Sequence, residues 1–519
     1  MQFSVSISSI SIPVFLFVYA LVAVLKHLET KKTDAREPPV VASPIPYVGH
    51  IIGMLLRGSR YLKSLGSRCP NLPIFTLPML NGRTYIVTSP ALAAQVQRAS
   101  KALSFNPVIP EVVNRVLGLD AGTMKIIRSG VESEDERGFV GDTQDMLYAR
   151  LAPGESLDEL TAAAGNEFLA QLTDYKEILN ANGGKKTEEL LGWVKQLVTV
   201  ATARFLYGPE NPLAIQPELE PLFWDFDAGI PGLLLNVYPS ITASKAYRGR
   251  EALVKAFTNY LTAGKKSTGS ALTQTRGVIA DKHGLDVEST ARCEVSFLFA
   301  GITNTAVTSY WLILHIFANP TLLKRIRKEL ELTLKAPSEK SSVRMMNIKT
   351  ITKDCKLLVS TFRETLRLYS DNASTRVVTT DTVLADQYFL KKGSILQIAG
   401  GIMHSDSTIW GGDAGQFNPE RFLEDSTKQK SVHPAAFRGF GGGATLCPGR
   451  HFALNEILAF VAVVVLLFDV SSVDDEELPI PKKKDDVLAI HILEPLEQVH
   501  VQIRRREGWD QCSLQLETS

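Results

Sequence analysis

The chain has 519 residues, of which 45% are hydrophobic and 21% charged, and its formal net charge is +1. A near-neutral charge argues against a nucleic-acid partner, because phosphates favour proteins with a clear excess of Lys and Arg. The five cysteines are odd in number and far apart, with no CxxC pair and no zinc-type spacing, so we expect a reducing compartment rather than a disulfide framework.

The first 25 residues carry no charged side chain, and residues 10–25 are almost wholly apolar. This run approaches the length needed to cross a bilayer. The alternatives are a re-entrant anchor and a cleaved signal peptide, but a signal peptide carries its positive charges before the apolar run. Here Lys26 and Arg36 follow it. The asymmetry predicts an N-terminal membrane anchor and basic flank over residues 1–37, with the rest of the chain in the cytosol.

A proline-rich segment follows over residues 38–50 and predicts a stiff hinge, because proline fixes φ and favours extended structure. Behind the anchor, residues 38–519 are expected to form one large domain. Residues 73–88 predict a hairpin whose turn is an Asn-Gly dipeptide, which suits a type I′ turn.

Ser89 and Pro90 predict the start of a helix, as a capping serine followed by proline at the first helical position. The chain between about 100 and 285 is mostly helical in pattern. Near the C-terminus, residues 499–503 alternate apolar and polar side chains and predict a strand.

Residues 290–318 contain no proline and are apolar on most faces, which predicts a helix buried inside a large domain. Small residues in this segment stand next to the polar group Thr303, Asn304 and Thr305. The simple interpretation is a core helix with satisfied polar groups. The alternative is that the small residues make room for a diatomic ligand. Asn319 and Pro320 are expected to end this helix and begin another.

Glu364 and Arg367 stand three residues apart in an amphipathic pattern, a spacing that allows a salt bridge on one helix face. Such a pair is commonplace and contributes little where it is exposed. A Pro-Glu-Arg-Phe segment that contains Arg421 follows later in the chain.

The segment that organises the chain is the glycine-rich loop 440–450, which carries Cys447 and precedes an apolar, helix-like run over residues 452–467. A cysteine just before a helix N-terminus experiences the positive end of the helix dipole, which favours the thiolate. Two alternatives are a small buried hydrophobic cysteine and a dinucleotide-binding loop. The dinucleotide loop requires a strand directly before the glycines and a helix directly after them, and the Cys-Pro step and Pro434 interrupt that order.

On these motifs the chain resembles the haem-thiolate monooxygenases, the cytochromes P-450. In that family Phe440, Gly443, Cys447 and Gly449 occupy the signature positions, and the resemblance implies that Cys447 is the proximal ligand of a haem b iron. Many members carry Arg or His at the position of Thr445. This chain lacks that basic residue, and in this respect it resembles the branch of the steroid 7α-hydroxylases and prostacyclin synthase.

The resemblance also assigns roles outside the loop. It implies that Glu364, Arg367 and Arg421 form a buried charge network that fixes the loop around the cysteine. Arg376 stands where family members often place a cation on a haem propionate, and a guanidinium suits a carboxylate bidentately. The alternative is that Arg376 is an ordinary exposed arginine of a surface strand.

The buried helix over residues 290–318 resembles the long distal helix of the family. There the family has an acid followed by a threonine, which help to protonate dioxygen. This chain departs twice, with Thr303 at the acidic position and Asn304 at the threonine position. We therefore expect protons to reach the distal side through Thr303, Asn304, Thr305 and ordered water.

The resemblance implies a mainly α-helical fold with small β-sheets, as one haem domain behind a transmembrane anchor in the endoplasmic reticulum membrane. It implies a monooxygenase that takes electrons from an NADPH-dependent reductase and oxidises an apolar small molecule, with a hint of a sterol or terpenoid. A peroxide-rearranging isomerase or dehydratase is the main alternative, because asparagine at the position of Asn304 is also typical of the branch that contains prostacyclin synthase. A non-catalytic haem protein is a further alternative.

Overall fold

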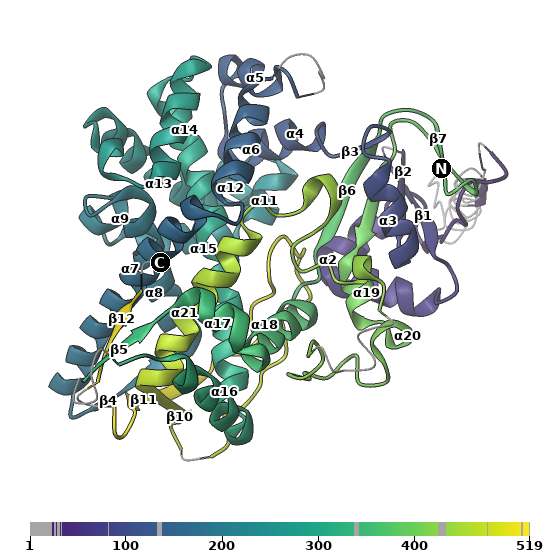
Figure 1. The fold of residues 1–519 in the computed structure, drawn as a ribbon. Coiled ribbons are helices and arrows are strands. Elements are labelled where there is room, and N and C mark those ends of the chain that lie inside the picture. The colour runs from purple at the N-terminus through teal and green to yellow at the C-terminus, as the bar shows by residue number, and fades with distance from the viewer. Residues whose placement is uncertain are drawn as a thin grey trace, which may run out of the picture.

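The computed structural model describes residues 34–517 apart from 81, 132–136, 337–341, 424–431, 475 and 510–511, together with residues 23, 24, 27 and 32. The expected membrane anchor therefore lies almost wholly outside the described residues. Within them the chain is mainly helical with small sheets, as expected (Figure 1).

The described α-helices are α2 (Gly49–Arg68), α3 (Pro90–Arg98), α4 (Val108–Leu117), α5 (Ala121–Arg128), α6 (Phe139–Arg150), α7 (Glu155–Ala181), α8 (Leu190–Tyr207), α9 (Pro212–Ile215), α10 (Leu219–Ala228), α11 (Ile230–Leu235), α12 (Pro239–Thr242), α13 (Ser244–Thr262), α14 (Ala271–Lys282), α15 (Val287–Phe317), α16 (Pro320–Thr333), α17 (Ile348–Asp354), α18 (Lys356–Tyr369), α19 (Gly400–Ser405), α20 (Ser407–Trp410) and α21 (Arg450–Leu467). Short 3₁₀ turns are η1 (Lys265–Thr268), η3 (Pro434–Ala436) and η4 (Gly443–Thr445).

The described strands are β1 (Ile74–Met79), β2 (Gly82–Val87), β3 (Leu103–Ser104), β4 (Lys185–Glu189), β5 (Val343–Met346), β6 (Ala373–Val378), β7 (Thr382–Leu384), β8 (Tyr388–Leu390), β9 (Ile395–Ala399), β10 (Phe468–Ser472), β11 (His500–Arg505) and β12 (Ser513–Leu516). They form a five-stranded sheet in the order β1-β2-β9-β6-β3, a three-stranded sheet β10-β11-β4, and the pairs β12-β5 and β7-β8. The five-stranded sheet lies beside the helical body, at the right in Figure 1.

Several local predictions are confirmed. The strands β1 and β2 pair antiparallel from Ile74 opposite Val87, which is the predicted hairpin. The hydroxyl of Ser89 accepts a hydrogen bond from the Leu92 backbone N–H at 3.5 Å and caps α3. The strand predicted near the C-terminus is β11, which pairs with β10 and β4.

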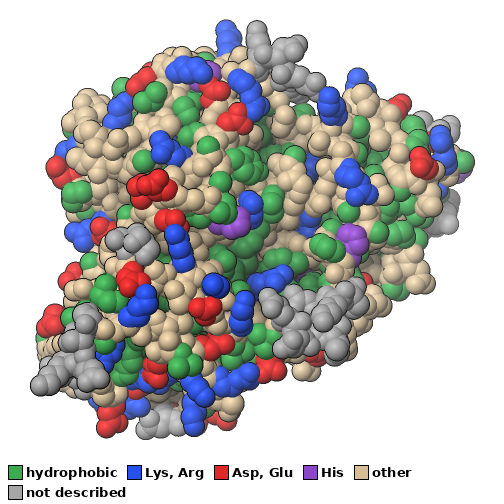
Figure 2. Space-filling model, viewed as in Figure 1, with side chains coloured by type: hydrophobic (Ala, Val, Ile, Leu, Met, Phe, Trp, Pro, Cys, Tyr) green, Lys and Arg blue, Asp and Glu red, His purple; other side chains and the backbone are tan. Residues whose placement is uncertain are grey.

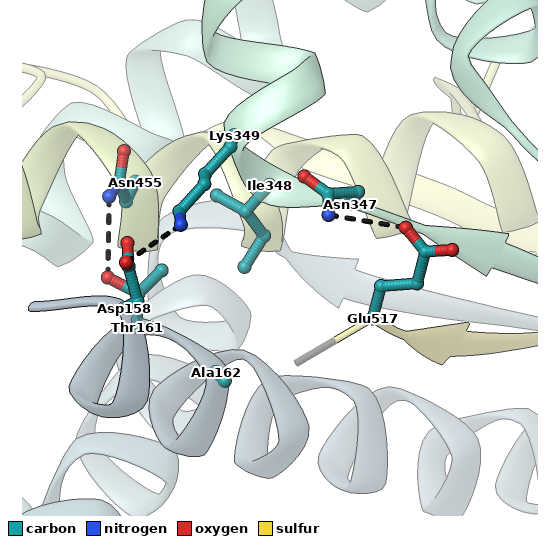
Figure 3. Close-up of a pocket in the computed structure, with 8 residues that line it drawn as sticks. All are labelled: Asp158, Thr161, Ala162, Asn347, Ile348, Lys349, Asn455 and Glu517. Carbon is teal, nitrogen blue, oxygen red and sulfur yellow. Dashed lines mark hydrogen bonds and ion pairs between the residues drawn. The ribbon is translucent and has the colours of Figure 1, made fainter. Parts of the chain in front are cut away.

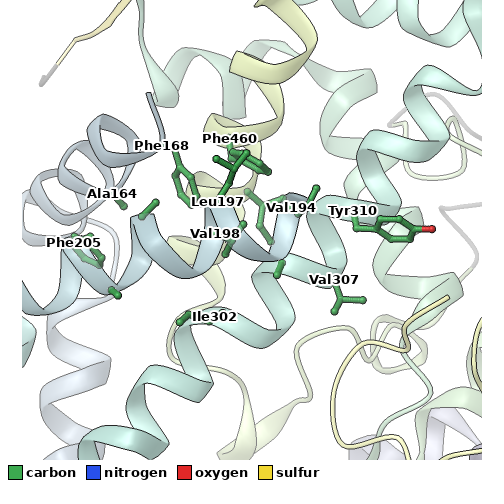
Figure 4. Close-up of a cluster of buried hydrophobic side chains, with 14 of the residues drawn as sticks. Ala164, Phe168, Val194, Leu197, Val198, Phe205, Ile302, Val307, Tyr310 and Phe460 are labelled. Carbon is green, nitrogen blue, oxygen red and sulfur yellow. The ribbon is translucent and has the colours of Figure 1, made fainter. Parts of the chain in front are cut away.

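The core is built from helices α7, α8, α15 and α21, whose apolar side chains meet in Figure 4. The predicted buried helix is α15, and Phe168 of α7 packs against Phe460 of α21 with ring centroids 5.0 Å apart. Both α15 and α21 are long and apolar enough to cross a membrane, but 72% and 61% of their most apolar windows are buried inside the protein. This burial is what a helix at the centre of a large domain shows.

The proline-rich segment is docked on the five-stranded sheet along part of its length. The Thr76 backbone N–H donates to the Pro39 carbonyl at 2.8 Å, and the Val41 N–H donates to the Thr76 carbonyl at 2.9 Å. The buried Glu37 carboxylate accepts a hydrogen bond from the Tyr85 hydroxyl at 3.0 Å. Residues 37–41 are therefore fixed to the domain.

The surface in Figure 2 mixes positive and negative side chains. Hydrophobic side chains gather in the hollow between the helical part and the part that contains the five-stranded sheet.

Candidate active site

A cavity of about 430 Å³ lies between α15 and the loop that precedes α21. Apolar side chains cover most of its wall, and helices α6, α8, α14, α15, α18 and α21 all contribute to it. Phe440, Gly449 and Cys447 line one side, and Ala300, Gly301 and Asn304 line another. The motifs that the sequence singles out in the loop and in α15 therefore meet at one cavity.

The glycine-rich loop is held in a tight conformation next to α3. Gly441 and Gly443 have φ values of +77° and +61°, a region that side chains with a Cβ rarely enter. A Cβ on Gly443 would lie 2.8 Å from the side chain of Gln97 in α3, so the close neighbour of this backbone is a helix of the same chain. The Cys447 backbone N–H donates to the Phe440 carbonyl at 2.9 Å and closes the loop.

Cys447 is partly buried, and this burial raises the pKa of its thiol, whereas the Gly449 N–H and the Arg450 charge lower it. The helix N-terminus therefore favours the thiolate, as expected, but desolvation outweighs it in the protein without haem. A coordinating metal deprotonates a thiol outright, so ionisation of Cys447 depends on its ligand.

The three polar residues of α15 point in different directions. Asn304 lines the cavity, and its Oδ1 accepts a hydrogen bond from the Ile492 backbone N–H at 3.0 Å. Thr305 also lines the cavity and donates to Glu456 of α21 at 3.3 Å. Thr303 is fully buried outside the cavity lining and donates to Asp227 of α10 at 3.3 Å. The structure thus brings Asn304 and Thr305, but not Thr303, to the cavity.

Glu456 is a cavity residue that sequence reasoning missed. It is buried, and its two carboxylate oxygens accept hydrogen bonds from Thr202 and Thr305, each at 3.3 Å. Burial raises its pKa to about 8, against the effect of these two hydrogen bonds. The carboxyl is therefore mostly protonated at neutral pH. Only the packing of α8, α15 and α21 brings these three residues together.

Two buried arginines lie next to β6: Arg438 lines the cavity, whereas Arg376 lines a neighbouring pocket on the other side of the loop residue Ala444. Arg376 donates to the hydroxyl of Thr445 at 2.6 Å, and Arg438 donates to the hydroxyl of Ser374 at 3.0 Å. Within the described residues neither guanidinium forms an ion pair, and the buried Nε of Arg438 has no hydrogen-bond partner. Burial, with the neighbouring Arg376 charge, lowers the pKa of Arg438 to about 10. A guanidinium without an ion pair suits a ligand that carries carboxylates. Arg438 was missed because a lone arginine before the glycines carries no motif.

The three residues of the predicted charge network contact one another. Glu364 receives two hydrogen bonds of 2.7 Å from Arg367, and Arg421 approaches both of its oxygens at 3.1 Å. All three side chains are buried. Nη1 of Arg367 donates to the carbonyls of His404 and Ala414 at 2.6 and 2.8 Å, and Nη2 donates to the Gln416 carbonyl at 3.3 Å, so this charge cluster is hydrogen-bonded on several sides.

His404 connects that network to Arg438, just before the cysteine loop. Its Nδ1 contacts the Ser370 carbonyl at 2.8 Å, and its Nε2 accepts the backbone N–H of Arg438 at 2.9 Å. Burial lowers the pKa of His404 to about 4. The ring is therefore neutral at physiological pH and holds the start of the loop against α18.

A second pocket, of about 30 Å³, lies near the C-terminus (Figure 3). Its polar groups bond one another, since Asn455 donates to Thr161 at 3.3 Å and Lys349 pairs with Asp158 at 2.7 Å. This volume holds no more than a water or two, so the pocket is not a substrate site.

Comparison with known proteins gives one consistent result. The family model described as Cytochrome P-450 matches residues 251–497. The chain is 30% identical over 493 residues to the cytochrome P-450 monooxygenase nodJ of Hypoxylon pulicicidum, with 92% of each chain covered. It is 28% identical to a cytochrome P-450 monooxygenase of Gibberella zeae, covering 92% of this chain and 90% of the relative. It is 23% identical to the 25-hydroxycholesterol 7-alpha-hydroxylase of Rattus norvegicus, covering 74% of this chain and 92% of the relative.

Proposed function

This chain belongs to the cytochrome P-450 family as a haem b-binding monooxygenase, and from that premise we propose that it oxidises an apolar, polycyclic small molecule with electrons from an NADPH-dependent reductase. One observation carries the proposal: a largely apolar cavity places Cys447 on one wall and the small residues of α15 on another. We propose a sterol or terpenoid of secondary metabolism as the substrate class, since relatives include fungal monooxygenases and a 25-hydroxycholesterol 7-alpha-hydroxylase.

The residues around the cavity fit haem. Cys447 would hold the iron, and the ion-pair-free guanidiniums of Arg376 and Arg438 would receive the propionates. When bound, haem supplies the oxidising chemistry, while the protein supplies ligation, orientation and a shielded pocket. Phe440 and Gly449 border the same wall and would pack against the cofactor.

The rest of the cavity orients the substrate. Apolar side chains such as Leu272, Phe297 and Ile492 exclude water and favour an apolar molecule. The Asn304 amide is fixed by the Ile492 N–H on its oxygen, which leaves its nitrogen as the hydrogen-bond donor for the cavity. Thr305 connects the cavity to the protonated carboxyl of Glu456, and this pair can hold a proton at the Glu456 carboxyl oxygen.

We also propose that residues 1–37 tether the domain to the endoplasmic reticulum membrane as a single-pass anchor, with the domain in the cytosol. The support is the charge asymmetry around the apolar N-terminal run. Residues 38–50 would then join the anchor to the domain.

The chemistry at Asn304 supports one competing function. An amide donor in place of a hydroxyl is compatible with a peroxide-rearranging isomerase that needs no reductase. The two functions differ in their requirement for electrons. Purified protein should convert substrate with NADPH and reductase if it is a monooxygenase, and with a hydroperoxide alone if it is an isomerase.

The decisive experiment compares Cys447→Ala with Cys69→Ala, Cys293→Ala and Cys512→Ala. We expect only Cys447→Ala to lose the thiolate-type absorbance of the reduced carbon monoxide complex. Strains that carry each variant are then compared by untargeted metabolite analysis. Loss of one oxygenated compound and accumulation of its precursor in the Cys447→Ala strain alone would identify the reaction. An oxygenating Cys447→Ala enzyme would refute the proposed function.

A further inference from the structure

We propose that Trp311 of α15 and Tyr369 of α18 form an electron relay that removes unspent oxidant from the haem site, with His315 as the base that takes the Tyr369 proton. The relay protects the enzyme in turnovers that oxidise no substrate. The proposal goes beyond the proposed function and rests on the monooxygenase activity, because an enzyme that activates oxygen forms such an oxidant. None of the three side chains lines the cavity.

The rings of Trp311 and Tyr369 are stacked face to face. Their centroids are 3.7 Å apart and their planes differ by 11°. Aromatic pairs generally prefer offset or edge-to-face arrangements with centroids about 4.5–7 Å apart, so packing alone does not favour this geometry. Close overlap of two π systems is the arrangement in which an electron passes readily between them, and indole and phenol are among the side chains that lose an electron most easily.

The Tyr369 hydroxyl has a base as its partner. His315 Nε2 lies 2.7 Å from the phenol oxygen. Burial lowers the pKa of His315 to about 3, so the ring is neutral and one of its nitrogens is an acceptor. Burial also raises the pKa of Tyr369, so the phenol keeps its proton at rest and donates it to Nε2. An oxidised phenol is a far stronger acid than a neutral one, so loss of an electron sends this proton to the histidine.

The stacked pair lies close behind the cavity wall. Trp311 stands about one turn beyond Thr308 on α15, and Tyr369 stands about one turn beyond Leu366 on α18. Both Thr308 and Leu366 line the cavity, and one turn is about 5.4 Å long. The Trp311 indole N–H also donates to the Leu493 carbonyl at 2.8 Å, and the residue before Leu493 lines the cavity. Three chain segments therefore place the pair next to the haem site.

The other end of the relay approaches the surface. His315 stacks on Phe417 with centroids 3.6 Å apart and planes that differ by 2°. Trp311 is 0% exposed, Tyr369 4% and His315 8%, and Phe417 is partly exposed. Exposure thus increases along this series, so a reductant in solution can deliver an electron at the end remote from the cavity.

A neighbouring tyrosine shows what the relay requires. Tyr310 is also fully buried and packs edge-on against Trp311, with ring centroids 5.0 Å apart. Its hydroxyl has no hydrogen-bond partner within the part of the chain that the structure describes, so its proton has no acceptor on oxidation. Of these two tyrosines, Tyr369 alone combines contact with Trp311 and a base on its hydroxyl.

Each step of the relay moves one electron and one proton. Tyr369 loses an electron through Trp311 to the oxidised haem site, and its phenolic proton passes to His315 Nε2, which leaves a neutral tyrosyl radical and an imidazolium. A thiol then returns one electron to the radical and releases one proton to solvent, while the His315 proton returns to the Tyr369 oxygen. Two such cycles, with two protons from solvent, reduce the untransferred oxygen atom to water and join two thiols in a disulfide.

The first test detects the radical in haem-loaded full-length protein without substrate. The protein is mixed with meta-chloroperoxybenzoic acid, frozen rapidly and examined by electron paramagnetic resonance. We expect a tyrosyl signal in the unaltered protein and in Tyr310→Phe, and its loss in Tyr369→Phe, which keeps the stacked ring but has no phenol proton. His315→Gln should also lose the signal, because an amide accepts the hydrogen bond but is a much weaker base. Ring-deuterated tyrosine in the growth medium should narrow the signal and assign it to tyrosine.

The second test measures protection. During turnover with NADPH, reductase and glutathione but no substrate, haem absorbance should fall faster in Tyr369→Phe and Trp311→Phe than in the unaltered protein and Tyr310→Phe. The absorbance of the reduced carbon monoxide complex verifies that each variant keeps its thiolate site. Equal radical signals and equal rates of haem loss in Tyr369→Phe and Tyr310→Phe would overturn the relay. An unaltered protein without the thiolate-type absorbance would refute the proposed function instead.

Discussion

At the residue scale, Glu456 connects the cavity to the stability of the fold. Its pKa is raised by burial from 4.5 to about 8, so between these values the folded chain keeps a proton that the unfolded chain has released. The contribution of Glu456 to stability is therefore fully present below about pH 4.5 and is lost as the pH rises through this window. At about 1.4 kcal/mol per pKa unit, the decline amounts to a few kcal/mol.

Glu456→Gln should abolish this decline, because the amide is neutral at every pH. We expect the free energy of unfolding of the variant to exceed that of the original protein at pH 8.5 by about 2 kcal/mol or more. The difference should be smaller at pH 5. Urea unfolding at both pH values measures the difference. Glu218→Gln on the exposed start of α10 is the control and should shift neither curve, whereas equal slopes for Glu456→Gln and the unaltered protein would show that Glu456 ionises normally.

Residues with a motif could be placed from the sequence, and residues without one could not. The spacing around Cys447 located the loop, and the pair Glu364 and Arg367 located the buried charge network. Arg438 and Glu456 carry no pattern of their own, because their surroundings are created by helices that are distant in the chain. Thr303 shows the opposite error, since its position in a motif suggested the cavity and its side chain contacts Asp227 instead.

At the scale of elements, buried charge joins α18 to the segment 404–421, which precedes the cysteine loop. Removing one member of a buried ion pair leaves the other uncompensated and costs about 3–5 kcal/mol. We therefore expect Glu364→Gln to lower the free energy of unfolding by about this amount and to weaken haem retention, because Arg367 and Arg421 both lose their carboxylate.

An exposed pair nearby provides the comparison. Glu420 contacts Arg325, and both side chains are about half exposed. Glu420→Gln should change stability by no more than about 1 kcal/mol. Guanidinium chloride unfolding measures the stability of both variants, and the haem content of the purified proteins measures haem retention. Similar losses of stability in the two variants would mean that the buried network contributes no more than a surface pair.

Elements were predictable where local signals are strong. The apolar run of α15, its end before Pro320, and the N-terminal cap of α3 follow from the sequence alone. The three-stranded sheet does not, because β4 pairs with β11 from the other end of the chain and β4 is polar along its length. Strand pairing of this kind depends on tertiary packing rather than on propensity.

At the scale of the whole molecule, Asp371 ties together segments from both ends of the chain. Its two oxygens pair with Lys63 of α2 and with Lys483 of the C-terminal segment, each at 2.8 Å. Ser59 adds a hydrogen bond of 3.0 Å. The sheet-containing part, α18 and the C-terminal segment thus share one buried carboxylate.

Burial alone raises the pKa of Asp371, but the charges of Lys483 and Lys63 outweigh it and lower the pKa from 3.8 to about 2. The stabilisation is therefore fully present above pH 4 and is lost as the pH falls towards 2, since the unfolded chain binds a proton first. Asp371→Asn should lower the free energy of unfolding at pH 7 by about 3 kcal/mol and flatten its dependence on pH between 4 and 2, as measured by urea unfolding. Asp474→Asn, an exposed change in the same C-terminal region, should do neither. If Asp371→Asn unfolds with the original acid profile, the two ends of the chain are joined by other contacts.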